Sequence, residues 1–380
     1  MKITAIDAIP FSIPLVKPPS KERKKWTTAW GSTDKANNVL VKLHTDEDII
    51  GIGECSPSPS YISEGQTDVV CSITNLLAPV IVGEDPFNIE KIMMRMEKAV
   101  YGKWCSKAGI DFALYDIMGK ALSVPAYQVL GGRSVDKLPH EYEITMGSIE
   151  EMVEEASWAI RQGYCKGLKV KVGIEPDRDV KALRAIRDEV GEEMAIIPDF
   201  NQGVKPYNTA SFAIRYIRKF QEVNPLFVEQ PVPGWDLYGM AKVADAVDTP
   251  ICADESLRSP YDICAIIRLQ AAEVISLKLQ KLGGIYWGKR VAEMAELAGI
   301  QAHAATLLDS SIGGSALLHF ALCTPNANQF PVETTHRYLA DDTTVESLEI
   351  RDGYVDVPEK PGLGIRIDEE KIERYRVKAQ

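Results

Sequence analysis

The feature that most constrains the fold of this sequence is a regular alternation of short apolar segments with longer amphipathic ones. It begins after residue 133 and repeats roughly every 30 residues. Short apolar segments predict buried strands, and apolar positions three and four residues apart predict helices. We expect strands in HEYEITM, GLKVKVG, AIIPDFN, LFVEQP, PICADES, EVISLKLQ, GIQAHAATL and QFPVET. Eight such units are typical of an α/β barrel, although an open doubly wound sheet alternates in the same way.

The chain before residue 125 has a different order of elements. KITAIDAIPFSIPL, NVLVKLHTD and IIGIGEC alternate with period two and predict strands, whereas residues 68–122 have helical periodicity. Strands followed by helices indicate an α+β domain, and the Pro and Gly residues of VPAYQVLGGR mark its end. After about residue 340, DG and PG turns predict a hairpin-like segment.

Charge and cysteine usage exclude several classes of function. A formal net charge of −11 argues against nucleic acid or an anionic membrane as the main partner. We find no signal peptide and no window near the roughly 18 apolar residues of a membrane-spanning helix. Seven scattered cysteines without a CxxC pair are typical of reduced thiols in a cytoplasmic protein. The absence of a glycine-rich nucleotide-binding motif disfavours a redox enzyme.

Three successive predicted strands end in a carboxylate: Asp199, Glu229 and Asp254. One carboxylate at a strand end is usually a helix cap or half of a surface ion pair. In a barrel, however, these strand ends converge on one mouth, where neighbouring carboxylates repel one another unless a cation lies among them. Oxygen ligands of this kind predict a Mg²⁺ site, with Mn²⁺ as the alternative.

Lysines flank these carboxylates. Lys169 and Lys171 point to the same side of their strand, which is either a functional face or a polar face open to solvent. Lys278 ends the sixth predicted strand, opposite the second in a barrel, so Lys171 and Lys278 should face each other across the mouth. Repulsion and burial predict lowered lysine pKa values. Such a lysine can remove the α-proton of a metal-bound carboxylate, and a second lysine can return it to the other face.

At these residues the sequence resembles the enolase superfamily, specifically its muconate lactonizing enzyme subgroup. The resemblance covers essentially the whole chain, through GIGEC, AGIDFALYDIMGKAL, VLGGR, KVKVG, DFN, VEQP, ADES, KLQKLGG and GLGI. It implies a (β/α)7β modified TIM barrel over residues 126–340 and an N-terminal α+β capping domain over residues 1–125. It further implies that residues 341–380 pack back on the capping domain, and that the protein forms a homo-oligomer.

The resemblance also implies roles for individual residues. Asp199, Glu229 and Asp254 would hold Mg²⁺, Lys171 and Lys278 would be the acid/base pair, and Lys169 would lie near the substrate carboxylate. Pairing of a lysine or histidine base with Mg²⁺ is an established property of this superfamily. Lys278 disfavours the mandelate racemase subgroup, which uses a histidine on the seventh strand.

For several neighbouring residues the sequence leaves two roles open. Asn201 either orients the ligands or begins a loop, and Glu255 and Gln230 are expected to support the ligands. Asp309 stands where several relatives carry glutamate. Glu333 resembles a glutamate of cycloisomerase-like members, with a structural role equally open. We expect His303 in the core or at the rim.

Two loops of the capping domain close over the substrate in this family. The first contains the basic residues Lys21, Arg23, Lys24 and Lys25, then Trp26 and Trp30. It is too polar for the core, so we expect a mobile surface loop: either a lid that suits an anionic or a cation–π-compatible substrate end, or simply solvated chain. We expect Trp30 and, from the second loop, Tyr61 to line the pocket.

We therefore expect a Mg²⁺-dependent isomerase that acts on a small carboxylate, most simply a racemase or epimerase. The alternatives are a muconate-type cycloisomerase, a syn-dehydratase of a β-hydroxy acid and, from a different class, a catalytically inactive binding homologue. The paired aspartates by which dipeptide epimerases hold a substrate ammonium are missing after the eighth predicted strand, which argues against dipeptide epimerisation.

Overall fold

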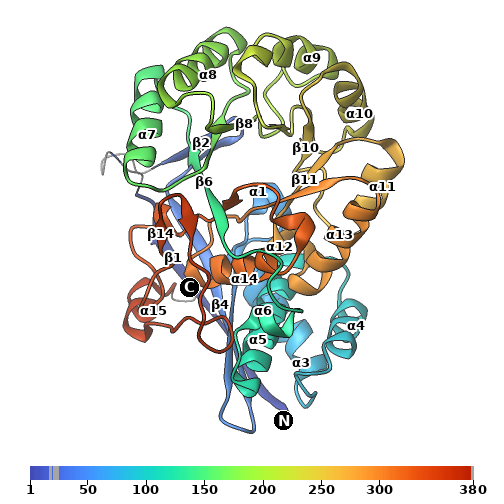
Figure 1. The fold of residues 1–380 in the computed structure, drawn as a ribbon. Coiled ribbons are helices and arrows are strands. Elements are labelled where there is room, and N and C mark those ends of the chain that lie inside the picture. The colour runs from blue at the N-terminus through green and yellow to red at the C-terminus, as the bar shows by residue number, and fades with distance from the viewer. Residues whose placement is uncertain (17–18, 20–24, 378–380) are drawn as a thin grey trace.

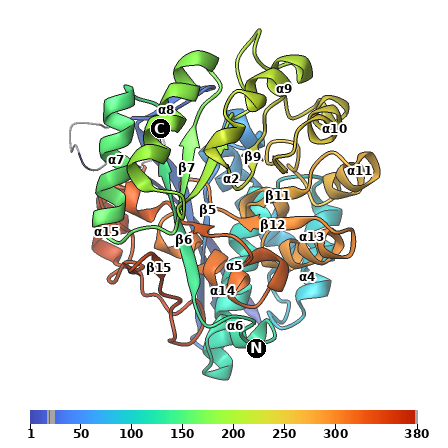
Figure 2. The ribbon, with the colours of Figure 1, turned by 45° about the horizontal axis from the view of Figure 1, so that its top comes forward.

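The computed structural model describes residues 1–16, 19 and 25–377. In Figure 1 the barrel occupies the upper part of the view, ringed by helices, and most of the N-terminal elements lie below it, except that β2 (Trp26–Thr28) lies in the upper part. Figure 2 looks further into the ring of strands. Among the described residues, no helix is both long and apolar enough to cross a membrane.

The N-terminal domain is an antiparallel sheet covered by helices. Its strands are β1 (Ile3–Pro14), β4 (Lys35–Thr45) and β5 (Ile50–Cys55), in the order β1-β4-β5. A separate hairpin joins β2 (Trp26–Thr28) to β3 (Gly31–Thr33). The helices are α1 (Pro59–Ile62), α2 (Gln66–Ser72), α3 (Ala78–Ile81), α4 (Ile89–Ala99) and α5 (Trp104–Leu122), with a π-helical turn at Ile73–Leu77.

A short helix, α6 (Ala126–Val129), leads into the barrel. The parallel strands are β6 (Leu138–Ile144), β7 (Gly167–Lys171), β8 (Ala195–Asp199), β9 (Val228–Glu229), β10 (Ile251–Ala253), β11 (Val274–Leu277), β12 (Gln301–Ala304) and β13 (Val332–Glu333). The intervening helices are α7 (Ile149–Arg161), α8 (Pro176–Val190), α9 (Ala210–Arg218), α10 (Leu237–Ala246), α11 (Asp262–Leu269), α12 (Leu279–Leu282), α13 (Ile285–Leu297) and α14 (Ser311–Leu322).

The pairing of the eighth strand decides between a barrel and an open sheet. The strands run in chain order from β6 to β12, and β13 returns to pair in parallel with β6. The predicted (β/α)7β barrel with an N-terminal capping domain is therefore confirmed, and the open doubly wound alternative is wrong.

The C-terminal segment contacts both parts of the molecule. Strand β15 (Tyr354–Val355) pairs antiparallel with β6 of the barrel and with β14 (Ile350–Arg351). Helix α15 (Glu369–Tyr375) ends beside β1, where the amide of Val377 donates to the carbonyl of Pro10 at 2.9 Å. The domain limits near residues 125 and 340 stay a prediction.

The expectation of a mobile polar loop before β4 needs correction for the part that is described. Trp26 begins the β2–β3 hairpin, is buried, and packs on Tyr338 with ring centroids 4.8 Å apart. The hairpin is also tied to the end of β6, because the amide of Thr27 donates to the hydroxyl of Thr145 at 2.8 Å. Lys21, Arg23 and Lys24 lie outside the described residues.

Candidate active site

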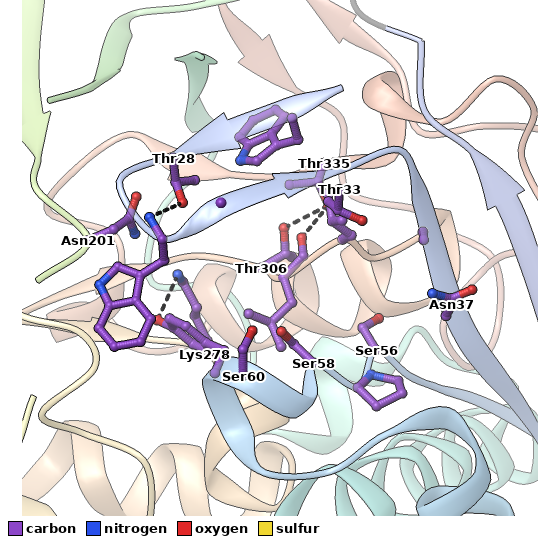
Figure 3. Close-up of a pocket in the computed structure, with 18 of the residues that line it drawn as sticks. Thr28, Thr33, Asn37, Ser56, Ser58, Ser60, Asn201, Lys278, Thr306 and Thr335 are labelled. Carbon is purple, nitrogen blue, oxygen red and sulfur yellow. Dashed lines mark hydrogen bonds between the residues drawn. The ribbon is translucent and has the colours of Figure 1, made fainter. Parts of the chain in front are cut away.

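A cavity of about 390 Å³ lies between the capping domain and the mouth of the barrel. Its capping-domain walls are the β2–β3 hairpin, the start of β4 and the segment that leads into α1. Its floor consists of residues at strand ends. Figure 3 shows Asn201 and Lys278 on the barrel side, with Ser58 and Ser60 among the labelled side chains of the other wall. Of the residues predicted for the site, the cavity is lined by Lys171, Lys278, Asn201, Glu333, Trp30 and Tyr61.

The three predicted ligand carboxylates lie on neighbouring strands. Asp199 and Glu229 end β8 and β9 and are register partners, and Asp254 directly follows β10. All three are fully buried. The carboxylate of Glu229 forms an ion pair with the ammonium of Lys169, with 3.0 Å between Oε2 and Nζ. Burial raises the pKa of Glu229 to about 7, with Lys169 opposing this and the charges of Asp199 and Asp254 adding to it.

These carboxylates suit a hard cation in their chemistry, since they offer only oxygen atoms and repel one another. Within the described ranges, however, no three His, Cys, Asp or Glu side chains are already arranged to hold a metal ion. Two of the carboxylates are instead engaged in ion pairs. A carboxylate oxygen of Asp199 lies 2.6 Å from the ammonium of Lys171, and one of Asp254 lies 2.8 Å from that of Lys278. A cation would compete with these lysines for the carboxylates.

Lys171 and Lys278 come from opposite sides of the barrel. Lys171 is the last residue of β7 and Lys278 directly follows β11, with β8, β9 and β10 between them in the sheet. Both are buried by more than nine-tenths and both line the cavity. Lys171 also pairs with Glu143, and the hydroxyl of Tyr61 lies 3.3 Å from the ammonium of Lys278. Their side chains can therefore reach one bound molecule from two directions.

The predicted lowering of the lysine pKa values is wrong for this arrangement. Burial alone would lower the pKa of Lys171, but the charges of Asp199 and Glu143 outweigh it and raise that pKa above its ordinary value. Likewise, Asp254 and Glu229 overcome the effect of burial on Lys278 and raise its pKa. The carboxylates, more than the other ammonium groups, determine the direction.

Lys169 lies below the cavity floor and does not line it. Its ammonium is fully buried among three carboxylates, at 2.8 Å from Glu333, 3.0 Å from Glu229 and 3.4 Å from Glu141. Burial alone would lower the pKa of Lys169, but the charges of these carboxylates outweigh it and raise that pKa. In this position Lys169 neutralises acidic side chains from three strands.

The supporting residues differ in how they contact the ligand carboxylates. The side-chain oxygen of Gln230 accepts from the amide of Asp254 at 2.8 Å and so fixes that backbone. The backbone amide of Asn201 donates to the side chain of Asp199 at 2.8 Å, and the side-chain amide of Asn201 donates to Glu255 at 3.4 Å. The hydroxyl of Tyr61 donates to Asp254.

Two predicted positions lie away from the open cavity. Asp309 is buried and does not line it, and burial raises its pKa well above the usual value. His303 is fully buried in the barrel interior, 3.1 Å from Glu141 and packed beside Phe227 and Phe330.

Sequence reasoning missed three charged residues of this cluster. Glu141 and Glu143 contact Lys169 and Lys171 from the neighbouring strand, and Lys281 is fully buried against Asp254. The period-two spacing of EYE in β6 matches that of KVK in β7 and could have indicated the two glutamates. Lys281 carried a weaker signal, its position three residues after Lys278 in a short helix.

Comparison with known proteins places this site in a family. Residues 12–131 match the mandelate racemase / muconate lactonizing enzyme N-terminal domain, and residues 151–371 match the family described as enolase C-terminal domain-like. The N-succinyl-L-Arg/Lys racemase of Bacillus cereus is 35% identical over 377 residues, which cover 99% of this chain and 98% of that protein. The L-Ala-D/L-Glu epimerase of Bacillus subtilis is 31% identical over 96% of this chain and 97% of that protein.

The solved structures agree with this assignment. The crystal structure of muconate lactonizing enzyme from Pseudomonas fluorescens, complexed with muconolactone, matches with a TM-score of 0.92 at 30% identity over 99% of both chains. The crystal structure of the N-succinyl Arg/Lys racemase from Bacillus cereus matches with a TM-score of 0.93 at 34% identity, over 100% of this chain and 99% of that one. This chain belongs to the mandelate racemase/muconate lactonizing enzyme family of the enolase superfamily.

Proposed function

We propose that this isomerase is a racemase or epimerase that removes the α-proton of a small carboxylate with one lysine and returns a proton from the other. The observation that carries the proposal is the position of Lys171 and Lys278, which end strands on opposite sides of the barrel and line one cavity. The similarity to a racemase and an epimerase over nearly the whole chain supports it.

We further propose Mg²⁺ as the cofactor, held by Asp199, Glu229 and Asp254. When bound, the cation would draw negative charge from the substrate carboxylate and so make the α C–H more acidic. The full burial of the Glu229 carboxylate beside Asp199 and Asp254, with Lys169 as its ion-pair partner at 3.0 Å, supports this set of ligands. Mn²⁺ has the same preference for oxygen ligands and is the alternative.

In this scheme each lysine acts on one face of the α carbon. Lys171 accepts the proton from one enantiomer and Lys278 donates to the opposite face, with the roles reversed for the other enantiomer. Carboxylates engaged with a cation have less negative charge to offer the lysines, so burial would then favour the neutral amine that a base requires. Tyr61, above Lys278, and Trp30, at the hairpin, would exclude water from the reacting atoms.

The two-base scheme is tested by exchange of the α-proton in D₂O with separate enantiomers of a carboxylate panel. Because each lysine serves one face, Lys171→Ala should reduce the rate of α-proton exchange of one enantiomer by at least about a hundredfold. Lys278→Ala should reduce the rate for the other enantiomer by the same factor. Racemisation should be lost in both variants. Lys181→Ala, an exposed lysine on the outer side of α8, is the control and should match the wild type. Wild-type rates of α-proton exchange and racemisation in either active-site variant would contradict the two-base scheme.

The related muconate lactonizing enzyme keeps cycloisomerisation as a second candidate. Incubation with cis,cis-muconate distinguishes cycloisomerisation from racemisation, since ring closure gives muconolactone and the absorbance of the conjugated diene decreases. Ring closure without α-proton exchange would replace the first proposal.

The metal proposal has a test that does not depend on turnover. Mg²⁺ that binds only the folded protein should stabilise it by about 2.7 kcal/mol at a hundred times its Kd, which appears as a rise in the Tm. Glu229→Gln should remove that rise, because it deletes a ligand charge but retains the shape of the side chain. Equal Mg²⁺ stabilisation in the variant would contradict the ligand set. No stabilisation in the wild type would favour the inactive binding homologue.

A further inference from the structure

The two lysines of the proposed reaction differ in the carboxyl groups that contact them. Lys171 pairs with Asp199 at 2.6 Å and also with Glu143. Among the described residues, Lys278 pairs with one carboxylate only, that of Asp254 at 2.8 Å. Asp199 and Asp254 are both proposed ligands of the cation, whereas Glu143 is not. Glu143 is therefore a partner that stays available to Lys171 when the ligand carboxylates are engaged with a cation.

The side chain of Glu143 lies at the cavity wall but is turned toward protein groups. It is 3% exposed and belongs to β6, between β7 and β13 in the barrel. Its carboxyl group contacts Lys171 of β7 and hydrogen-bonds with Glu333 of β13. Burial raises the pKa of Glu143 to about 8, with the charge of Lys171 opposing this effect and that of Glu333 adding to it. Near neutral pH, Glu143 therefore offers Lys171 an acceptor oxygen more than a full negative charge.

A buried phenol fixes the backbone of Glu143. The amide of Glu143 donates to the hydroxyl of Tyr338 at 2.8 Å, and that hydroxyl donates to the carbonyl of Glu143 at 3.4 Å. The ring of Tyr338 packs on Trp26 and on Tyr142, with ring centroids 4.8 Å and 5.4 Å apart. Tyr338 is buried and does not line the cavity. Packing outside the cavity thus sets the position of Glu143, which suits a group with a fixed protein partner.

We propose that Glu143 is a positioning residue for Lys171: its side-chain oxygen accepts an N–H of the amine and so directs the nitrogen lone pair at the α-proton of the substrate. This inference rests on the proposed α-proton chemistry. In that step the C–H bond breaks, its electron pair stays on the substrate, and the new N–H bond converts the amine to an ammonium group. A lysine side chain has several rotatable bonds, and a fixed acceptor for one N–H excludes orientations in which the lone pair misses the proton.

The contact acts on one of the two bases. Lys278 has the hydroxyl of Tyr61, 3.3 Å away, where Lys171 has Glu143. Loss of Glu143 should therefore slow proton transfer on the face of the substrate that Lys171 serves and spare the other face. Two other roles for Glu143 give different results. A group that binds the substrate affects KM for both enantiomers, and a group that only stabilises the fold lowers kcat for both, together with the Tm.

The test measures kcat and KM for α-proton exchange in D₂O with Mg²⁺ and the separate enantiomers of lactate, mandelate, alanine and N-acetylphenylalanine. Lys171→Ala identifies the enantiomer that Lys171 serves. Glu143→Met, which has a similar volume but no acceptor oxygen, should lower kcat for that enantiomer by at least about tenfold. The KM of that enantiomer, and both constants of the other one, should stay within about twofold of the wild type. Glu143→Gln retains an acceptor oxygen and should restore most of the rate.

Two further variants separate positioning from a loss of stability. Tyr338→Phe releases the backbone of Glu143 from outside the cavity and should lower the same kcat by a smaller factor. It keeps the inference testable if Glu143→Met does not fold. Glu155→Met is the matched control, because Glu155 is a fully buried glutamate of α7 outside the cavity lining. This control should keep wild-type rates for both enantiomers.

The outcomes distinguish this inference from the proposed function. Wild-type rates in Glu143→Met, equally lowered rates for both enantiomers, or a rise in KM for both would overturn the inference and leave the function standing. A Glu143→Gln variant as slow as Glu143→Met would also overturn it, because the effect would then belong to the charge and not to the acceptor oxygen. If the wild type exchanges the α-proton of no probe, the proposed function fails and this inference fails with it.

Discussion

Lys169 combines two properties that are rarely found together, a fully buried ammonium and three carboxylate neighbours from different strands. The ammonium of Lys169 compensates the cost of burying these three carboxylates. Removal of one member of a buried ionic cluster leaves the others uncompensated, which costs more than the pair itself contributes. Lys169 should therefore matter for the stability of the fold.

We predict that Lys169→Met lowers the free energy of unfolding by about 3–5 kcal/mol near neutral pH, measured by urea denaturation with a chelator present. The methyl thioether fills a similar volume, so the loss reports charge rather than a cavity. Lys42→Met is the matched control, because Lys42 pairs at 2.6 Å with the largely exposed Glu369 and should cost no more than about 1 kcal/mol. A similar loss in both variants would contradict the role given to Lys169.

At this scale the sequence indicated which side chains gather but not their electrostatic balance. Lys169, Lys171 and Lys278 were identified from strand periodicity and strand ends. The direction of the pKa shifts of Lys169 and Lys171 depends in part on Glu141 and Glu143. These glutamates lie on β6, which pairs with β7 although helix α7 separates the two strands in the chain. The sign of such a shift follows from distances between strands, which a pattern along one strand does not contain.

At the scale of elements, the strands were the easiest to predict and α14 the hardest. Strands β7 to β13 lie within their predicted segments, and β6 begins two residues before its own, because short apolar segments ending in polar residues are distinctive. Helix α14 has no polar face, since every one of its residues from Ser311 to Leu322 is buried. Without a polar side there is no helical periodicity to detect. The β2–β3 hairpin was missed for the converse reason, because its polar residues conceal one buried anchor, Trp26.

Helix α14 depends on a carboxylate from the other domain. Glu54, on β5, is fully buried and accepts hydrogen bonds from the hydroxyl of Ser310 at 2.7 Å and the amide of Gly313 at 2.8 Å. The side chain of Asn38 also donates to it at 2.7 Å. Burial raises the pKa of Glu54 to about 7, so its role rests on the hydrogen bonds that it accepts from amides without a partner in the helix.

We predict that Glu54→Ala lowers the free energy of unfolding by roughly 3 kcal/mol, because several buried donors lose their acceptor. Glu54→Gln keeps one oxygen and should lose less. Glu47→Ala, which removes a largely exposed partner of the N-terminal amine, serves as the control and should change stability by less than about 1 kcal/mol. Urea denaturation of the three variants at one pH makes the comparison, and a Glu54→Ala protein as stable as the control would contradict this account of the helix cap.

At the scale of the whole molecule, the parts of the chain meet at buried polar side chains. His319 of α14 is fully buried where the barrel, the segment after the capping domain and the C-terminal segment come together. One ring nitrogen accepts from the amide of Tyr127 at 3.3 Å, and the other donates to the carbonyl of Leu363 at 3.2 Å. This pair of bonds requires the neutral ring. Burial lowers the pKa of His319 to about 4.

This joint makes stability depend on pH with a definite sign. The unfolded chain binds a proton to this histidine below about pH 6.5, whereas the folded protein resists protonation down to about pH 4. Between these values the unfolded state holds more protons, so the free energy of unfolding falls as the pH falls. The contribution of His319 is fully present above pH 6.5 and amounts to about 3 kcal/mol, on the basis of 1.36 kcal/mol for each pKa unit. Burial lowers the pKa of His336 to about 4 as well and also lowers that of His140, so the wild type loses stability through all three rings.

We predict that His319→Gln, which can still form hydrogen bonds but does not titrate, loses less stability between pH 7 and pH 4.5 than the wild type does, by as much as about 3 kcal/mol. Urea denaturation at steps of half a pH unit gives the slope, which should correspond to about one proton fewer in the variant. Between pH 7 and pH 8, above the window, the two proteins should change in parallel, and this interval is the internal control. An acid slope unchanged in His319→Gln would show that the three segments are not joined through a neutral imidazole, and the loss of stability in acid would then have to come from His140, His336 or a carboxylate whose pKa is lowered, such as Glu333.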